Sequence, residues 1–239
     1  MIRIRNFICV FILLLLVASS TMGQRRQVMN LPKYDRTIVH FGFVLGLNVS
    51  KFRVNPVADL RIIDSVYSIV PKATSGLNLG IVSNLKLGEH WDFRFIPALA
   101  FTQRNLEYAM VYTDSNFSEE TITKQVESTY LEFPFMLKFK STRIDNYRVY
   151  VLAGWKFGID MVSQAKVLAK DKEIVKLTKH DYGYEIGVGF DFYMTYFKFS
   201  PELKMYNGLK NLLVQDGRRF SSPLDGLYSK TFVISFLFE

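Results

Sequence analysis

The fold of this chain is indicated most clearly by residues 147–160, which read YRVYVLAGWKFGID. Apolar side chains occupy every odd position, whereas the even positions include Arg148, Lys156 and Asp160. A period of two predicts a β-strand whose two faces meet different surroundings. The stretch is also far longer than the roughly 5–6 residues of a typical strand in a globular protein.

The same alternation recurs throughout the sequence, and no segment has a comparable helical pattern. Eight segments show it: 41–49, 77–87, 91–102, 130–139, 147–160, 182–192, 197–205 and 231–238. One face of each is nearly all large apolar residues, while the other mixes Gly and Ala with polar and charged residues. Many segments reach the ~9–11 residues that a tilted strand needs to cross a bilayer.

Long two-faced strands have two interpretations. In a soluble barrel or sandwich the apolar face points inward, but such strands are short and do not need so many bulky aromatic residues. In an outer-membrane barrel the apolar face meets lipid and the polar face lines the interior. We therefore predict an all-β fold, an eight-stranded antiparallel transmembrane β-barrel that lies in outer-membrane lipid.

The connections between the segments alternate in length, as they do in bacterial barrels. Long connections are expected at 50–75, 105–127, 161–181 and 207–229, and short ones at 88–90, 141–146 and 194–196. Short turns of such barrels face the periplasm and long loops face outward, so both termini of the mature chain are expected in the periplasm. Aromatic residues near the connections, among them Tyr193 and Tyr108, predict girdles at the two bilayer interfaces.

The N-terminus has the three parts of a secretory signal peptide. Arg3 and Arg5 precede an unbroken apolar run at 7–17, and small residues follow as far as Gly23. This run falls well short of the ~20 residues that span a bilayer as a helix. The predicted organisation is a removed signal peptide at 1–23, a periplasmic N-terminal segment at 24–37 and the barrel at 38–239.

Composition and motifs exclude several other classes of protein. The only cysteine, Cys9, lies in the apolar N-terminal run, so the mature chain is expected to contain no disulfide or thiolate zinc site. The formal charge of +8 comes from basic residues scattered among aromatic segments, a pattern that does not predict nucleic-acid binding. His40, His90 and His180 are expected on a strand, a turn and a long loop, without metal-ligand spacing. We expect no enzyme, no cofactor and no metal site.

Charged residues on the inward phase of the strands are the first candidate site. They are Lys86, Arg94, Glu132, Lys138, Arg148, Lys156, Glu185, Asp191, Lys198, Glu202 and Lys204. An eight-stranded barrel is only wide enough for side chains to fill it. An unpaired charge there would be costly, so these residues are expected to form a network of ion pairs. A structural plug and a narrow pore are the two interpretations, and we predict a plug that does not conduct.

The last strand is the second candidate site. Residues 231–239 resemble the C-terminal assembly signal of outer-membrane barrels through Thr231, Phe236 and Phe238. Val233 stands where glycine is usual, and Glu239 follows the aromatic residue that normally ends the signal. The expected partner is the barrel assembly machinery, which would pair with the exposed strand edge by β-augmentation.

Several motifs resemble a known family. TYLEFPFMLK at 129–138 and VYVLAG at 149–154 resemble central strands of the small outer-membrane barrels of the Bacteroidetes. More particular segments resemble the PorT proteins, called SprT in gliding species: NLPKYD at 30–35, HFGF at 40–43, FRV at 52–54, RFIP at 94–97 and QRNLEY at 103–108.

This resemblance implies an outer-membrane component that is needed for type IX secretion and, in gliding bacteria, for adhesin export. Its partners would then be other components of that secretion system. Composition and spacing alone lead only to the eight-stranded barrel, so a general surface barrel for adhesion or defence is the alternative.

Overall fold

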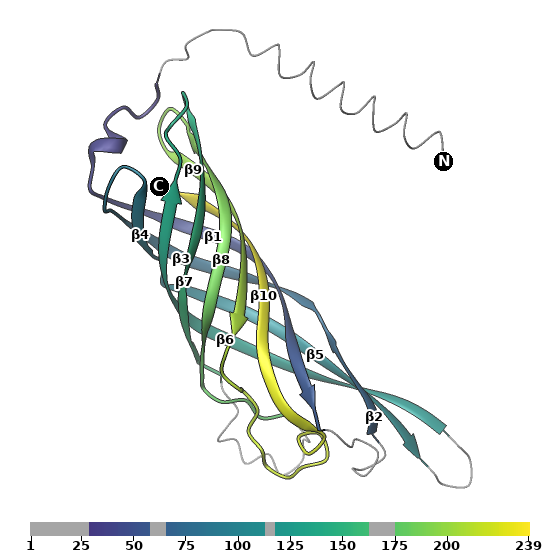
Figure 1. Cartoon of the computed structure of the whole chain (residues 1–239). Coiled ribbons are helices and arrows are strands. Elements are labelled where there is room, and N and C mark those ends of the chain that lie inside the picture. The colour runs from purple at the N-terminus through teal and green to yellow at the C-terminus, as the bar shows by residue number, and fades with distance from the viewer. Residues whose placement is uncertain (1–28, 58–65, 113–117, 163–174) are drawn as a thin grey trace, which may run out of the picture.

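The structure is a computed structural model, and it describes residues 29–57, 66–112, 118–162 and 175–239. Within these ranges it has one 3-10 helix, Tyr34–Arg36, and ten strands (Figure 1). The strands are β1 (Val39–Pro56), β2 (Val66–Lys72), β3 (Thr74–Lys86), β4 (Trp91–Phe95), β5 (Ala98–Tyr112), β6 (Ser118–Lys140), β7 (Tyr147–Asp160), β8 (His180–Tyr193), β9 (Lys198–Gly208) and β10 (Leu224–Phe238). No helix among the described residues has the length and apolar character needed to cross a membrane. The predicted signal peptide, residues 1–23, lies outside the described residues.

The strands form one antiparallel sheet whose pairings return to their starting point. From β1 the order runs through β10, β9, β8, β7 and β6 to β4 and β5, then to β3, which pairs with β1. β4 and β5 share one place in this ring, because both lie between β3 and β6 in one continuous register. The interruption falls at Pro97, which has no N–H to donate to the ladder. With β2 outside the ring, the other nine strands occupy eight positions.

The two faces of the ring differ as the sequence predicts. On β1, outward-facing Phe43 and Leu47 are 53% and 54% exposed, whereas the alternate residues Val44 and Asn48 are buried. The same alternation runs along β7 and β8. An apolar outside around a filled interior confirms the predicted all-β, outer-membrane barrel fold.

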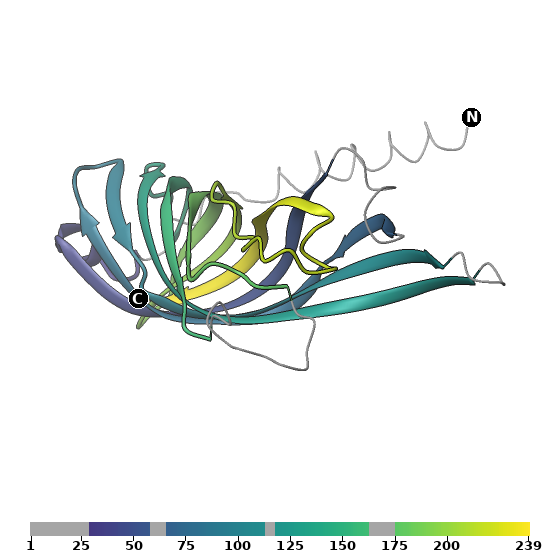
Figure 2. The same ribbon diagram turned by 90° about the horizontal axis from the view of Figure 1, so that it is seen from below.

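The two ends of the barrel are built differently. At one end, here called the turn end, three short connections at 87–90, 141–146 and 194–197 lie near the 3-10 helix and the C-terminus (Figure 1). At the opposite end, here called the loop end, β5 and β6 continue well past the ring as a paired hairpin. Their pairing extends from Ala98↔Glu132 to Tyr112↔Ser118, with β2 along the other side of β5. Figure 2 shows these three strands reaching beyond the rest of the sheet.

The prediction of long loops at 50–75 and 105–127 is therefore wrong. The expected loop 105–127 is mostly strand, and the expected loop 50–75 contains the end of β1, all of β2 and the start of β3. The physical reason is that the projecting hairpin buries one of its faces. Leu106 and Tyr108 point into an apolar cluster that the loop interpretation did not include.

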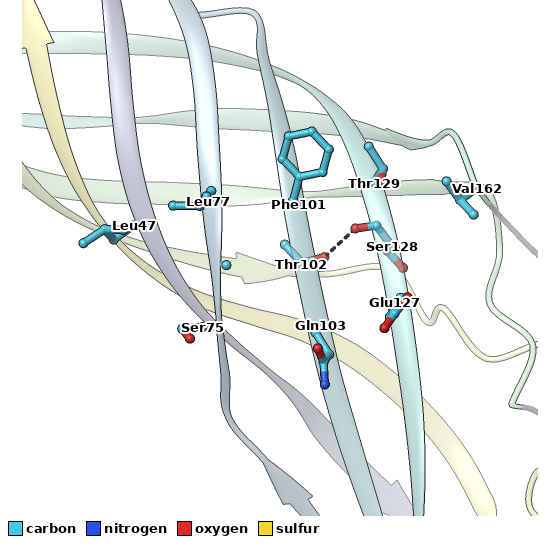
Figure 3. A pocket seen from close by; sticks show the side chains of 11 residues that line it. Leu47, Ser75, Leu77, Phe101, Thr102, Gln103, Glu127, Ser128, Thr129 and Val162 are labelled. Carbon is cyan, nitrogen blue, oxygen red and sulfur yellow. Dashed lines mark hydrogen bonds between the residues drawn. The ribbon is translucent and has the colours of Figure 1, made fainter.

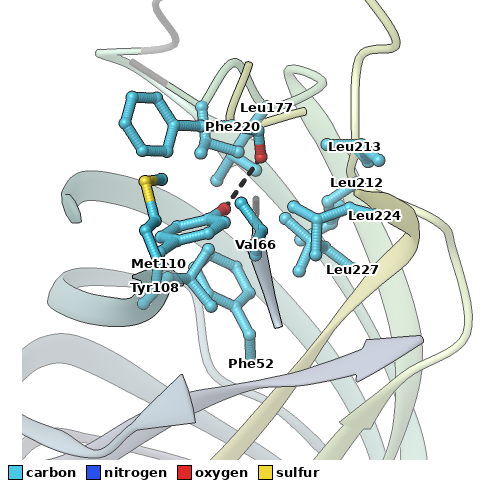
Figure 4. Close-up of a cluster of buried hydrophobic side chains, with 12 residues drawn as sticks. Phe52, Val66, Tyr108, Met110, Leu177, Leu212, Leu213, Phe220, Leu224 and Leu227 are labelled. Atoms are coloured by element: carbon cyan, nitrogen blue, oxygen red, sulfur yellow. Dashed lines mark hydrogen bonds between the residues drawn. The ribbon is translucent and has the colours of Figure 1, made fainter. Parts of the chain in front are cut away.

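That apolar cluster, here called the cap, covers the interior at the loop end. It gathers residues from β1, β2, β5, β10 and the connections next to β8 and β10 (Figure 4). Its members are Phe52, Val66, Leu106, Tyr108, Met110, Val175, Leu177, Leu212, Leu213, Phe220, Leu224 and Leu227. The Tyr108 hydroxyl donates to the carbonyl of Phe220 at 2.9 Å, which ties the hairpin to the β9–β10 connection. Tyr108 is fully buried, so its predicted place in a lipid-facing girdle is wrong.

Candidate functional site

The interior is crossed by a buried ion pair near the turn end. Arg94 on β4 donates from Nη1 to Glu202 on β9, and neither side chain has any exposed surface. In a ring of eight positions, β4 and β9 lie opposite each other. A second contact joins Arg94 Nη2 to Glu239 at 3.2 Å, and Lys198 Nζ lies 2.9 Å from the same carboxylate. Side chains therefore span the interior at this level.

A second group of contacts surrounds Asp191 on β8. Lys138 Nζ lies 2.8 and 3.0 Å from its two oxygens, and the Ser200 hydroxyl donates to it at 2.7 Å. The Lys138 ammonium also lies 3.6 Å from the centre of the Tyr150 ring, whose hydroxyl donates to Glu202 at 2.7 Å. Desolvated charges are tolerated only when they are paired and hydrogen-bonded in this way.

The network continues toward the middle of the barrel. Lys156 Nζ lies 2.8 Å from Glu132 and 3.4 Å from Glu185. Lys204 lies 3.6 Å from Glu185 and 3.5 Å from Glu202, which links this group to the pair that crosses the interior. Five cations thus face five carboxylates: Arg94, Lys138, Lys156, Lys198 and Lys204 against Glu132, Glu185, Asp191, Glu202 and Glu239.

The remaining two sequence-predicted residues lie at the rim of the turn end. Arg148 contacts Asp35 at 3.2 Å, and Lys86 Nζ donates to the backbone carbonyl of Asp35 at 2.5 Å. Arg143, in the connection at 141–146, makes a further ion pair with Asp35 at 3.2 Å. The rim is therefore organised around one residue of the N-terminal segment.

Residues 30–36, here called the strap, close the turn end. Asn30 donates through its backbone N–H to Asn146 at 2.8 Å and through Nδ2 to the carbonyl of Tyr193 at 3.0 Å. The Tyr34 ring stacks on His40 with 3.8 Å between centroids, and its hydroxyl donates to Glu239 at 2.7 Å. Tyr193 is buried against the strap and is not part of a lipid-facing girdle, contrary to the sequence-based expectation.

The Tyr34 phenol and the Glu239 carboxyl, which form this hydrogen bond, both have pKa values displaced from their ordinary ranges. Burial raises the pKa of the Tyr34 phenol, and the Glu239 charge raises it further, so Tyr34 remains the hydrogen-bond donor. Burial also raises the pKa of Glu239, but the nearby Lys198 and Arg94 charges outweigh it and lower this pKa to about 2. The Glu239 carboxyl is therefore ionised in the folded barrel at neutral pH.

Sequence reasoning missed Glu239 and the strap as parts of this site. Glu239 continues the inward phase of β10, on which Thr231, Val233 and Ser235 are also buried, so the period of two could have placed it. No local pattern reveals the strap, because its contacts with Asn146, Glu239 and Arg143 join residues more than 100 positions apart in the chain.

The predicted assembly-signal residues do not join the network. Thr231 faces inward, with its Oγ1 3.0 Å from Ser50 Oγ on β1. Phe236 and Phe238 are on the outward face of β10; Phe236 stacks on Phe199 and Phe238 on Phe43. These contacts join β10 to its two neighbouring strands, and recognition by the assembly machinery stays a prediction.

The three histidines lie apart from one another. His40 is on β1, His90 is in the turn at 87–90, and His180 is the first residue of β8 and not part of a loop. In the described part of the chain, no group of three or more His, Cys, Asp or Glu side chains has a geometry that could hold a metal ion.

An open groove of about 580 Å³ lies on the wall of the barrel near the loop end (Figure 3). A row of residues paired in register across β1, β3, β5 and β6 lines it: Leu47, Leu77, Phe101 and Thr129. Gln103 and Glu127, opposite each other on β5 and β6, form its polar border. The groove thus joins an apolar surface to polar side chains.

A closed ring of antiparallel strands, apolar outside and filled with charged side chains, defines the class of transmembrane β-barrels. The family model described as "Outer membrane protein beta-barrel domain" matches residues 24–214, most of the chain. The chain therefore belongs to this family of outer-membrane β-barrel proteins. No curated relative matches the sequence.

Several solved structures are similar in arrangement to this chain. Ail, the attachment invasion locus protein of Yersinia pestis, is 15% identical with a TM-score of 0.40, over 84% of this chain and 99% of that one. Neisserial surface protein A is 9% identical with a TM-score of 0.42, over 83% and 97%. OprG from Pseudomonas aeruginosa is 15% identical with a TM-score of 0.38, over 82% and 93%. Likeness at this level carries no information about function.

Proposed function

We propose that this chain is a non-enzymatic outer-membrane protein of the PorT/SprT type, required for type IX secretion and, in gliding species, for adhesin export. The barrel assembly machinery would insert it, and its loops or turns would then contact other secretion components. Support from the sequence comes from the resemblance of segments 30–35 and 103–108 to that family.

The observation that carries the proposal is where those two segments lie. Segment 30–35 lies within the strap, where Tyr34 contacts the last residue of the chain. Segment 103–108 leads β5 out of the ring and places Leu106 and Tyr108 in the cap. Both segments build specialised features at the ends of the barrel, where partner proteins have access, and neither is needed for a bare barrel.

The interior favours a role in contacts over a role as a channel. The pair of Arg94 and Glu202 crosses the interior, the strap lies over the turn end and the cap over the loop end. The inward charges therefore support the plug that the sequence predicts, and we expect no conductance in planar bilayers.

A deletion strain tests the secretion role. Loss of the gene should leave type IX cargo in the periplasm, and the wild-type gene supplied in trans should restore export. The abundance of unrelated outer-membrane barrels should stay unchanged, which separates a secretion defect from a general assembly defect. Normal export in the deletion strain would contradict the proposal.

The alternative is a small surface barrel for adhesion or defence. The projecting β5–β6 hairpin favours it, because a paired hairpin beyond the bilayer offers an attachment surface. Normal secretion together with lost attachment in the same deletion strain would support this function.

We also propose that the turn end, with both termini and segment 24–37, faces the periplasm. The support is the general rule that short turns are periplasmic and long loops external. A peptide tag at Asp216, in the β9–β10 connection, should then be labelled on intact cells. Tags at Glu89 or Asn146, in two short turns, should be labelled only after the outer membrane is opened. Equal labelling of all three positions contradicts this orientation.

A further inference from the structure

Three cations on the outer wall of the barrel form a cluster that makes no ion pair with an acidic residue in the described part of the chain. Lys51 on β1 lies directly opposite Lys230 on β10, and Arg53 lies opposite Tyr228. The Arg53 guanidinium carbon lies 4.6 Å from the centre of the Tyr228 ring, which holds the side chain against the wall. Over the described ranges, none of the ion pairs involves Lys51, Arg53 or Lys230.

The cluster lies where the apolar surface of the barrel ends. On the outward face of β1, Leu47 and Val49 precede Lys51, and on β10 the exposed Phe232 follows Lys230. Val49 and Phe232 are themselves a cross-strand pair, directly next to the two lysines. The cations therefore occupy the level at which the hydrocarbon of a bilayer gives way to lipid headgroups.

Two like charges placed directly opposite each other destabilise an antiparallel pair. Among the described residues neither Lys51 nor Lys230 forms an ion pair, so an anion bound from the surroundings would offset the repulsion. Arginine and lysine are the side chains best suited to bind phosphate, arginine through its planar fork and lysine as a point charge.

The surroundings of the cluster favour a lipid over a soluble anion. Leu47 is four residues before Lys51 on the same face of β1, and it lines the groove shown in Figure 3. Leu77 and Phe101 continue this apolar surface across β3 and β5. A phosphate bound at the cluster would therefore lie at one end of an apolar surface along which an acyl chain can pack.

We propose that Lys51, Arg53 and Lys230 bind the phosphate of an outer-membrane lipid whose acyl chain packs along β1 toward the groove. This site is independent of the secretion role, because it rests on the outer wall of the barrel and not on the strap or the cap.

The test compares two charge-neutralising variants with a matched control. Lys51→Gln and Lys230→Gln each remove one cation of the cluster, whereas Lys33→Gln removes an exposed lysine at the turn end. The folded full-length proteins, in neutral detergent, are titrated with phosphorylated lipid A and with dephosphorylated lipid A. Each cluster variant should bind the phosphorylated lipid about fivefold more weakly, since one basic residue near a charged lipid surface contributes about that factor. Lys33→Gln should bind as the wild type does.

A stability measurement distinguishes loss of the site from loss of the fold. Without lipid, Lys51→Gln and Lys230→Gln should melt at a higher temperature than wild type, because each removes the repulsion between the lysines. Phosphorylated lipid A should stabilise the wild type more than either variant. Unchanged affinity in both cluster variants, equal affinity for dephosphorylated lipid A, or full competition by equimolar inorganic phosphate would overturn the proposal.

Discussion

Replacing Glu239 by alanine is predicted to destabilise the folded barrel by about 3 kcal/mol. The carboxylate has no exposed surface, and it lies 2.7 Å from the Tyr34 hydroxyl, 2.9 Å from Lys198 and 3.2 Å from Arg94. Removing one partner of a buried ion pair costs about 3–5 kcal/mol, because the other charge is left uncompensated. The lower end of that range is expected here, since Arg94 keeps its contact with Glu202.

The assay is urea unfolding of chains refolded into detergent micelles, followed by tryptophan fluorescence and by the folded band on unheated gels. Refolding in vitro leaves out the assembly machinery, so any effect of the last residue on recognition does not enter. Glu89→Ala is the control, because it removes an exposed carboxylate from a turn. Glu239→Gln should lose less than Glu239→Ala, since an amide oxygen still accepts a hydrogen bond from Tyr34.

A Glu239→Ala barrel within about 0.5 kcal/mol of the Glu89→Ala barrel would refute this reasoning, since changes of that size are usual for surface substitutions. The interior charges would then be hydrated and weakly coupled, and the interior would not be a closed plug.

Three other perturbations test separate parts of the structure. Lowering the pH should destabilise the wild-type barrel more than it destabilises the Glu239→Gln barrel. The pKa of Glu239 is lowered in the folded state, so the stabilisation by its carboxylate is complete above the unfolded pKa and is lost as pH falls from about 5 toward 2. Parallel acid unfolding curves for the two proteins would contradict this. Phe236→Lys places a charge on the lipid face of β10 and should cost about 2–4 kcal/mol in lipid vesicles, whereas Tyr196→Lys, in a turn, should cost little. Gly154→Ala would put a Cβ 2.0 Å from the carbonyl oxygen of Phe135, so thermal melting should show a loss of about 1–3 kcal/mol. Gly88→Ala meets nothing within 4 Å and should leave the melting temperature unchanged.

The sequence predicts the barrel wall well because each strand repeats one physical rule. A residue on β7 or β8 meets either lipid or the packed interior, so outward and inward positions alternate without interruption. Once the direction of one side chain is known, the directions of all the other side chains on that strand follow. The eight segments identified in this way correspond to the eight positions of the ring.

The features that were missed depend on contacts between distant parts of the chain. The hairpin beyond the ring has polar residues on one face, and only the cap, which includes Leu212 and Leu227, shows why the other face is buried. The strap depends on Arg143 and Glu239, which no local pattern connects to Asp35 or Tyr34. The ion pairs themselves follow from strand order and register, so the sequence could list the charged residues but not their partners.

The buried charges are divided unequally between the two parts of the chain. Of the ten network charges described above, the chain through β7 contributes three cations and one carboxylate: Arg94, Lys138, Lys156 and Glu132. From β8 onward the chain contributes the other two cations and four carboxylates of the network: Lys198, Lys204, Glu185, Asp191, Glu202 and Glu239. The first part therefore carries a surplus of two positive charges, and the second a surplus of two negative charges. Without β8, β9 and β10 the network would keep a surplus of two positive charges, so charge pairing as well as strand pairing favours closure of the barrel by these three strands.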